Sequence, residues 1–415
     1  MKKPLTATLS IGLLALTATG QDQTLLVKAP RIVVAPNVIL EDQSLLIRDG
    51  VIARVGPEIP EAAKRNATVV EFEGTIVPGF VNPHTHLGLG ADLAERISAL
   101  TPDLKASDAF DPFDEWLLRN ARRGVTTLGL APLSANTFAG MSAVVKAGEI
   151  GEVIDDSCYM KIALVNEAFD QQRYPTSRMG AADLIEQSFA DARLATTPND
   201  AETAALRNVL SGSTRLAIHA RTHGSITAAL DLCDELGITP ILIGADKADR
   251  SAKRIAALGG SVILSGLAMT DSRTALELPA KLHAAGVQLS FMADREPSAS
   301  AGSSGPAMPP GIPARFRSQF QSAAPAAGPP TPGHPDSLRL SAALAMRHGL
   351  PRDAALATLT RTPATQCGVQ DSAGSLRQGC AADFAVYSGD PLDLTSRLTA
   401  VYVAGQPIDL QGEDQ

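Results

Sequence analysis

The chain of 415 residues is poor in cysteine: Cys158, Cys233, Cys367 and Cys380 are scattered along it, and no two of them form a CxxC pair. So sparse a set excludes the disulfide framework of a small secreted domain and a cysteine zinc knuckle. We therefore interpret all four as buried thiols.

Basic charge and long apolar runs are also scarce. The 36 lysines and arginines are outnumbered by 44 aspartates and glutamates, which gives a net charge of −8 and a pI of about 5.4. A chain of this charge is not expected to bind nucleic acid or an anionic membrane surface. Beyond the N-terminus no segment is long and apolar enough to predict a membrane span.

The N-terminus contains a short apolar stretch within "MKKPLTATLSIGLLALTATGQ". Lys2 and Lys3 precede an apolar run to Leu16, and small residues end at Gly20. This order is typical of a secretory signal peptide. We expect residues 1–20 to be removed and the protein to be exported, periplasmic or secreted, without a lipid anchor because no cysteine follows.

What the chain does have is the composition of a loop-rich globular protein, with 45% hydrophobic residues, 19% charged residues, 34 glycines and 28 prolines. Its length allows one large domain and a smaller one. Residues 24–78 contain short β-type runs, with Asp49-Gly50 as a hairpin turn. The far C-terminus has the same character.

Between these ends, apolar strand-like runs alternate with helical stretches. The strand-like runs are the one before His84, then "GVTTLGLAP", "YMKIALV", "TRLAIHA", "TPILIGA", "SVILSG" and "VQLSFMA", with a weaker eighth at "SAVVKA". Apolar strands each followed by a helix are typical of a parallel sheet covered on both faces. We predict a (β/α)8 barrel of the TIM type, with its site at the carboxyl ends of the strands.

Two histidines, His84 and His86, follow the first of these runs with one residue between them. On a strand, side chains at i and i+2 point to the same face. Both imidazoles would then face one site. The pattern indicates either half of a metal site or two satisfied histidines at a buried strand end.

The segments around these histidines resemble the amidohydrolase superfamily. "VPGFVNPHTHLG" is similar to its first-strand motif, "ALATLTRTPATQCGV" to its last helix, and "GSLRQGCAADFAVYSGDPLDLTSRLTAVYVAGQPI" to its closing segment. The likeness covers nearly the whole mature chain and is closest to the exported, imidazolonepropionase-related members. It implies a small β-sandwich domain built from both chain ends, so we expect residues 21–78 and 362–415 to form that domain and 79–361 the barrel.

The resemblance also implies a hydrolase of carbon–nitrogen bonds in a small molecule, with one or two divalent ions, zinc being the expected one. Its ligands are two first-strand histidines, a carboxylated lysine or a glutamate on strand 4, histidines on strands 5 and 6, and a strand-8 aspartate that also serves as base. His84 and His86 match outright. His219 takes the strand-5 place and Asp294 the strand-8 place, with a satisfied strand-end histidine and a loop or capping aspartate as the alternatives.

Two ligand positions depart from the pattern. Strand 6 ends in Gly244, and Asp246 or His223 are the only nearby substitutes, although an exposed loop aspartate is the simpler interpretation of Asp246. On strand 4 both Lys161 and Glu167 are candidates. Lys161 lies inside an apolar run, where carboxylation would relieve a buried charge, and Glu167 lies nearer the strand end and is slightly favoured.

A long segment rich in Pro, Ala, Gly and Ser, residues 295–336, follows Asp294. A loop of this length is usually functional or disordered, so we consider both an active-site lid and a disordered insertion, with Arg315 and Arg317 as ordinary arginines. The remaining histidines, His283, His334 and His348, are expected on helices or in a loop.

Because the strand-6 histidine is missing, we also consider a second function. The chain is either an active hydrolase or a degenerate, non-catalytic homologue that serves as a binding protein or as a partner subunit. As partners we expect a small-molecule substrate and either a second copy of the chain or a related amidohydrolase.

Overall fold

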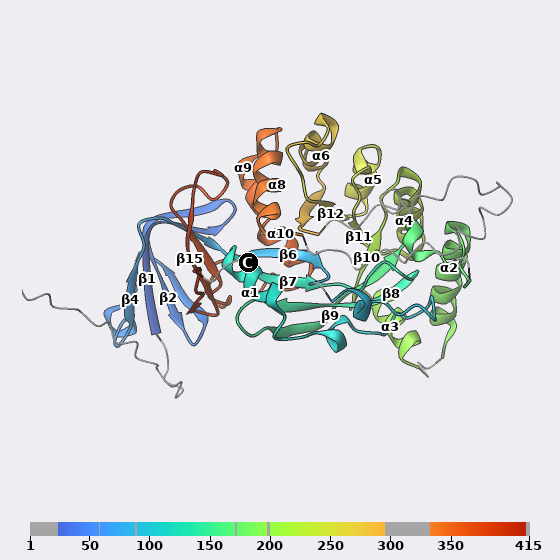
Figure 1. Cartoon of the computed structure of the whole chain (residues 1–415), viewed down its shortest axis with the longest axis horizontal. Helices are drawn as coiled ribbons and strands as arrows, with labels where there is room; N and C mark the ends of the chain where they lie inside the picture. Colours follow the sequence, from blue (N-terminus) through green and yellow to red (C-terminus); the bar gives the residue numbers. More distant parts are fainter. Residues whose placement is uncertain are drawn as a thin grey trace, which may run out of the picture.

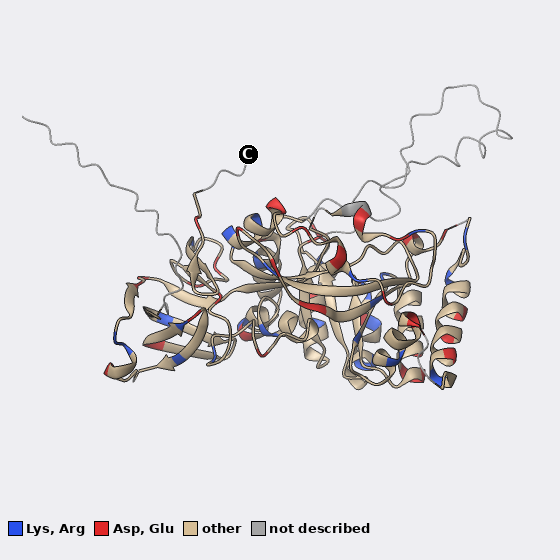
Figure 2. Ribbon diagram, turned by 90° about the horizontal axis from the view of Figure 1, so that it is seen from below, with Lys and Arg blue, Asp and Glu red and all other residues tan. Residues whose placement is uncertain are grey.

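Two eight-stranded sheets and the helices around one of them make up the computed structural model of the chain, which describes residues 24–57, 59–87, 89–170, 172–196, 200–294 and 333–411. The predicted signal peptide and most of the 295–336 segment, with Arg315 and Arg317, lie outside these ranges. Within them, no helix is long and apolar enough to cross a membrane. Lysines and arginines are interspersed with aspartates and glutamates over both sheets (Figure 2).

The larger sheet confirms the barrel. Its strands follow one another in chain order, from β6 to β13, and β13 lies against β6, so the sheet is nearly closed. The strands are β6 (Phe80–Thr85), β7 (Val125–Leu130), β8 (Phe138–Lys146), β9 (Glu152–Ala163), β10 (Arg215–His219), β11 (Pro240–Ile243), β12 (Ser261–Ser265) and β13 (Gln288–Met292). Strands β9 to β13 pair in parallel, with His219 between Ala163 and Ile243.

The prediction of a helix after every strand is wrong between β7 and β9. Strand β8 confirms the weak run at "SAVVKA", but it pairs antiparallel with both β7 and β9. The connections, residues 131–137 and 147–151, contain no helix. A parallel pair needs a crossover of about a dozen residues or more. Connections this short permit only antiparallel neighbours.

Helices cover the rest of the barrel. Figure 1 shows α4, α5, α6 and α8 in an arc outside β10 to β13, while the long strands β8 and β9 run along the other side. The helices are α1 (Glu115–Arg122), α2 (Arg178–Leu194), α3 (Ala201–Leu210), α4 (His223–Leu236), α5 (Ala252–Ala257), α6 (Arg273–Ala284), α8 (Asp336–Arg347), α9 (Arg352–Ala357) and α10 (Arg361–Gln366). Thr222 and Ser225 form a capping box on α4. The side chain of Asp114 caps α1.

The second sheet is built from both ends of the chain. Its order is β16-β15-β14-β5-β1-β2-β3, with β4 paired to β1. The strands are β1 (Thr24–Ala35), β2 (Val38–Arg48), β3 (Val51–Gly56), β4 (Thr68–Glu71), β5 (Thr75–Pro78), β14 (Phe384–Tyr387), β15 (Leu398–Val403) and β16 (Gln406–Pro407). Antiparallel pairing of β14 with β5 joins the two ends. The turn at Asp49-Gly50 has positive φ at both residues, as a tight hairpin requires.

All four cysteines are buried free thiols, as predicted. Burial raises the pKa of the Cys158 thiol well above its ordinary value, and the neighbouring Cys367 adds to the shift. Burial likewise raises the pKa of Cys233 to about 12. These thiols are part of the packed interior.

Candidate active site

Five of the predicted site residues lie inside the barrel. His84 and His86 come from the end of β6, Lys161 from β9, His219 from the end of β10, and Asp294 follows β13. Each is at most 1% exposed. Buried polar groups require partners, and the partners found here connect the five residues to one another and to the segment that follows β7.

His84 contacts the predicted strand-4 lysine. The Nζ atom of Lys161 lies 3.0 Å from Nε2 of His84 and donates to the main-chain oxygen of Pro132 at 2.7 Å. The rings of His84 and His86 stand edge to face, with centroids 5.0 Å apart. The i, i+2 spacing on β6 therefore does bring both imidazoles to one side of the strand.

His86 is held at two atoms. Its Nδ1 lies 2.7 Å from the main-chain oxygen of Ala131, and because a carbonyl oxygen only accepts, that nitrogen is the donor. Its main-chain N–H donates to Oδ2 of Asp294 at 2.9 Å. The other carboxylate oxygen, Oδ1, accepts from the main-chain N–H of Gly333 at 2.8 Å. Asp294 thus links β6 to the chain that enters α8.

His219 is held by a hydroxyl and packs against a glycine. Oγ of Ser134 lies 2.7 Å from its Nδ1. On the other side of the ring, a Cβ on Gly244 would lie 2.9 Å from Nε2 of His219. Gly244 has a φ of +64°, a conformation that side chains rarely adopt. The ring of His219 therefore occupies the space that a side chain on residue 244 would need.

Glu167, the favoured strand-4 candidate, does not join this cluster. It lies in a 3-10 turn after β9 and forms an ion pair with Arg221, which follows β10. Asp246 accepts the main-chain N–H of Ser265, and His223 is exposed at the start of α4. Of the two strand-4 candidates, the structure brings Lys161 to the histidines.

The donor types suit a divalent ion, because imidazole nitrogen and carboxylate oxygen are ligands that zinc takes. The donors are not gathered around one point, however. In the described part of the chain, no group of three or more His, Cys, Asp or Glu side chains is arranged to hold a metal ion. The amine of Lys161 lies 3.0 Å from Nε2 of His84, so a metal bound at that nitrogen would require the amine to move or to be carboxylated.

Residues 131–134 are the part of the site that sequence reasoning missed. Ala131 and Pro132 act through main-chain oxygens, which leave no trace in residue type. Ser134 is one of many serines in the chain, and its only signal is its place directly after an apolar strand.

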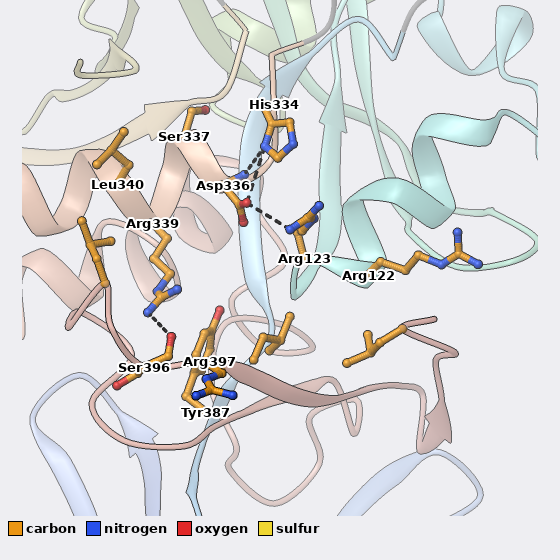
Figure 3. A pocket seen from close by; sticks show the side chains of 13 residues that line it. Arg122, Arg123, His334, Asp336, Ser337, Arg339, Leu340, Tyr387, Ser396 and Arg397 are labelled. Carbon is orange, nitrogen blue, oxygen red and sulfur yellow. Dashed lines mark hydrogen bonds and ion pairs between the residues drawn. The ribbon is translucent and has the colours of Figure 1, made fainter. Parts of the chain in front are cut away.

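A cavity of about 650 Å³ lies elsewhere, where α1 and α8 meet β14 and β15 (Figure 3). None of the predicted site residues lines it. Arg339 of α8 stacks over Tyr387 at 4.7 Å and donates to the main-chain oxygens of Pro391, Asp393 and Ser396 at 2.6 to 2.8 Å. Arg123 pairs with Asp336 at 3.3 Å across the same space. The contacts of Arg339 join the barrel to the composite sheet.

Comparison with known proteins bears on the predicted superfamily. Residues 335–409 match the profile of the amidohydrolase family. An amidohydrolase from Thermotoga maritima has the same fold over 93% of this chain and 99% of its own, with a TM-score of 0.72 and 25% identity. These likenesses support the predicted resemblance to the amidohydrolase superfamily.

Two further likenesses are shorter or weaker. A stretch of 91 residues is 34% identical to the N-substituted formamide deformylase of Arthrobacter pascens, covering 21% of this chain and 17% of that protein. The matched stretch therefore spans about a sixth of that relative's length. An adenosine deaminase from Xanthomonas campestris, described with bound zinc, covers 93% of this chain and 92% of its own with a TM-score of 0.50 and 17% identity, which indicates a shared fold alone.

Proposed function

We propose that this amidohydrolase cleaves a carbon–nitrogen bond in a small cyclic amide, imide or peptide-like substrate, with one or two divalent ions, zinc being the expected one. The observation that carries the proposal is the contact of His86 with Asp294, which brings the predicted base to the pair of histidines. The Arthrobacter relative is named a deformylase and the Xanthomonas neighbour is described with zinc. The first supports this reaction class and the second supports this metal.

A bound divalent ion supplies Lewis acidity at a carbonyl oxygen and makes a water molecule easier to deprotonate. Asp294 accepts the proton of the attacking water and passes it to the leaving nitrogen. Each of its carboxylate oxygens accepts one main-chain N–H, which fixes the carboxylate while leaving lone pairs for the proton. His84, His86 and His219 are the proposed nitrogen ligands, and Lys161, rather than Glu167, is the strand-4 group that adjoins them.

One observation favours a second function. Gly244 stands where the resemblance implies a strand-6 histidine, so the alternative is a barrel that lacks this ligand. A barrel of this kind would serve as a binding protein or as the partner subunit of an intact relative. Retention of His84, His86 and Asp294 together argues for chemistry, since a binding barrel has no need of all three.

Metal analysis of the purified full chain tests the choice. The active form is expected to carry close to one equivalent of zinc or another divalent ion and to hydrolyse at least one member of a panel of amides, lactams and dipeptides. His86→Ala should lose the metal. A chain that stays metal-free after incubation with zinc and cleaves nothing in the panel would exclude the hydrolase and favour the binding protein.

Two further proposals concern the protein in the cell. Residues 1–20 support export to the periplasm or beyond, and N-terminal sequencing of the mature protein should find a start close to Gln21. A mature protein that still begins at Met1 contradicts export.

The second proposal is that the chain assembles with itself or with a related amidohydrolase. Light scattering of the purified chain measures the mass of the assembly.

A further inference from the structure

We propose that residues 131–134, which connect β7 to β8, position the side chains of the site, and that Ser134 sets the tautomer of His219. This inference rests on the proposed function in treating His219 as a ligand. Three contacts of 2.7 Å carry it: Ala131 O with Nδ1 of His86, Pro132 O with Nζ of Lys161, and Ser134 Oγ with Nδ1 of His219. Three of four consecutive residues therefore contact side chains that come from β6, β9 and β10.

The connection is itself fixed in place. The main-chain N–H of Ala131 donates to Thr85 O at 2.9 Å, and that of Leu133 donates to Leu93 O at 2.9 Å. At its far end, Thr137 O accepts from Ala163 N, also at 2.9 Å. The antiparallel strand β8 explains the path, because the chain must turn back across the end of the barrel to enter β8. A helix after β7 would have carried these residues away from the site.

The contacts differ in whether they determine which ring nitrogen of the histidine carries the proton. A carbonyl oxygen only accepts, so Ala131 leaves His86 with its proton on Nδ1 and its lone pair on Nε2. A hydroxyl donates or accepts, so either tautomer of His219 is compatible with Ser134. We assign Ser134 as the acceptor of the Nδ1 proton. His219 then presents the lone pair of Nε2 on the side of Gly244, as a ligating ring needs when its other nitrogen is held by a partner.

Ser134→Ala in the full chain tests this positioning role. Long-range ¹H–¹⁵N spectra of the metal-free protein at about pH 8, above the ordinary histidine pKa of about 6.5, report which ring nitrogen of His219 carries the proton. The wild type should show the Nδ1–H form, and Ser134→Ala should shift towards the other tautomer or a mixture. Zinc affinity, measured by competition with a chelator, should fall about 10- to 100-fold, as is usual when a ligand's hydrogen-bond partner is lost.

Ser142→Ala is the matched control. Ser142 lies on β8, is fully buried, and its hydroxyl has no hydrogen-bond partner among the described residues. Ser134→Thr keeps a hydroxyl and should keep the wild-type tautomer and affinity. If Ser134→Ala does not fold, Ser134→Cys, which accepts hydrogen bonds only weakly, replaces it. Unchanged His219 signals in the Ala or Cys variant would overturn the proposal. A wild type that binds no zinc but whose tautomer depends on Ser134 would instead refute the metal-dependent function and leave the positioning role standing.

Discussion

The main-chain N–H of His86 donates to Oδ2 of Asp294 at 2.9 Å, across 208 residues of chain. The two residues follow β6 and β13, the first and last strands of the barrel sheet. This bond therefore lies at the seam of the nearly closed barrel. Asp294 has a structural task as well as the proposed chemical one, and an experiment on it must separate the two.

Asp294→Asn should lower turnover by about 10²- to 10⁴-fold, the usual cost of removing a general base. Because one carboxylate oxygen becomes an NH2 group, either His86 N–H or Gly333 N–H loses its acceptor, and the free energy of unfolding should fall by about 1 to 3 kcal/mol. Steady-state kinetics and urea denaturation measure the two effects. Asp246→Asn removes another aspartate that accepts a main-chain N–H, and it should leave turnover largely intact. Equal turnover in Asp294→Asn and wild type would exclude Asp294 as the base.

His84→Ala and His86→Ala should both abolish metal binding and leave a folded barrel, but with different costs in stability. His84 supports the buried amine of Lys161, so its loss should reduce the free energy of unfolding more than the loss of His86. Lys161→Met in the His84→Ala background should recover part of that loss. A double-mutant cycle by chemical denaturation measures the coupling. If the effects of the His84 and Lys161 changes on the free energy of unfolding are additive, the contact between the two side chains contributes no coupling free energy.

The site residues that the sequence predicted best are those fixed by a strand period. His84 and His86 share a side of β6 because the pleat repeats every two residues, and His219 and Asp294 lie at the ends of apolar runs that are indeed strands. The choice between Lys161 and Glu167 could not be made from position along β9 alone. The choice depends on Arg221, which follows β10 and forms an ion pair with Glu167.

The missed part of the fold was readable in connection length. Only five residues separate β8 from β9, too few for a parallel crossover, yet the weak apolar character of "SAVVKA" concealed where β8 lies. The contacts made by main-chain atoms could not be predicted from the sequence. The oxygens of Ala131 and Pro132 act on His86 and Lys161 through a path that only the antiparallel turn creates.

The cysteines should be unreactive in the native protein. With its pKa raised to about 12, Cys233 has a thiolate fraction at pH 8 about three orders of magnitude below that of a free thiol. Burial restricts access further. Reaction with a disulfide reagent should be slow in buffer and should yield four thiols per chain in denaturant. A fast phase in the folded protein would contradict the buried assignment.

Acid should weaken the contact between α9 and the segment after β14. Burial alone would raise the pKa of Asp390, but hydrogen bonds from Arg352 and from the main chain of Leu392, together with the charge of Arg352, lower it overall. A lowered folded-state pKa means that the carboxylate stabilises the fold above the unfolded value of about 3.9 and that this contribution is lost as the pH falls through the folded value.

Asp390→Asn should therefore lower the melting temperature at pH 7 and have less effect at pH 3. The pair is partly exposed, so about 1 kcal/mol or less is at stake. Asp42→Asn, at an exposed position on β2, controls for the loss of one carboxylate. The same loss for Asp390→Asn at both pH values would contradict the assignment.

Restoring a side chain at Gly244 should damage the site rather than repair it. Any Cβ there lies 2.9 Å from Nε2 of His219, and the φ of +64° strains every residue other than glycine. Gly244→Ala should destabilise the protein by about 1 kcal/mol through the backbone and should also displace the His219 ring. Gly212→Ala provides the comparison, because Gly212 has a φ of +76° and no atom within 4 Å of its Cβ position. Both variants should lose similar stability in urea, whereas only Gly244→Ala should lose zinc affinity and alter the His219 ring signals. Gly244→His, the family's own residue, should behave as Gly244→Ala or worse. A Gly244→His variant that binds zinc more tightly than the wild type would contradict this prediction. The His219 ring would then move to make room for a ligand at position 244. The glycine would be a lost ligand, and not a position to which the rest of the site has adapted.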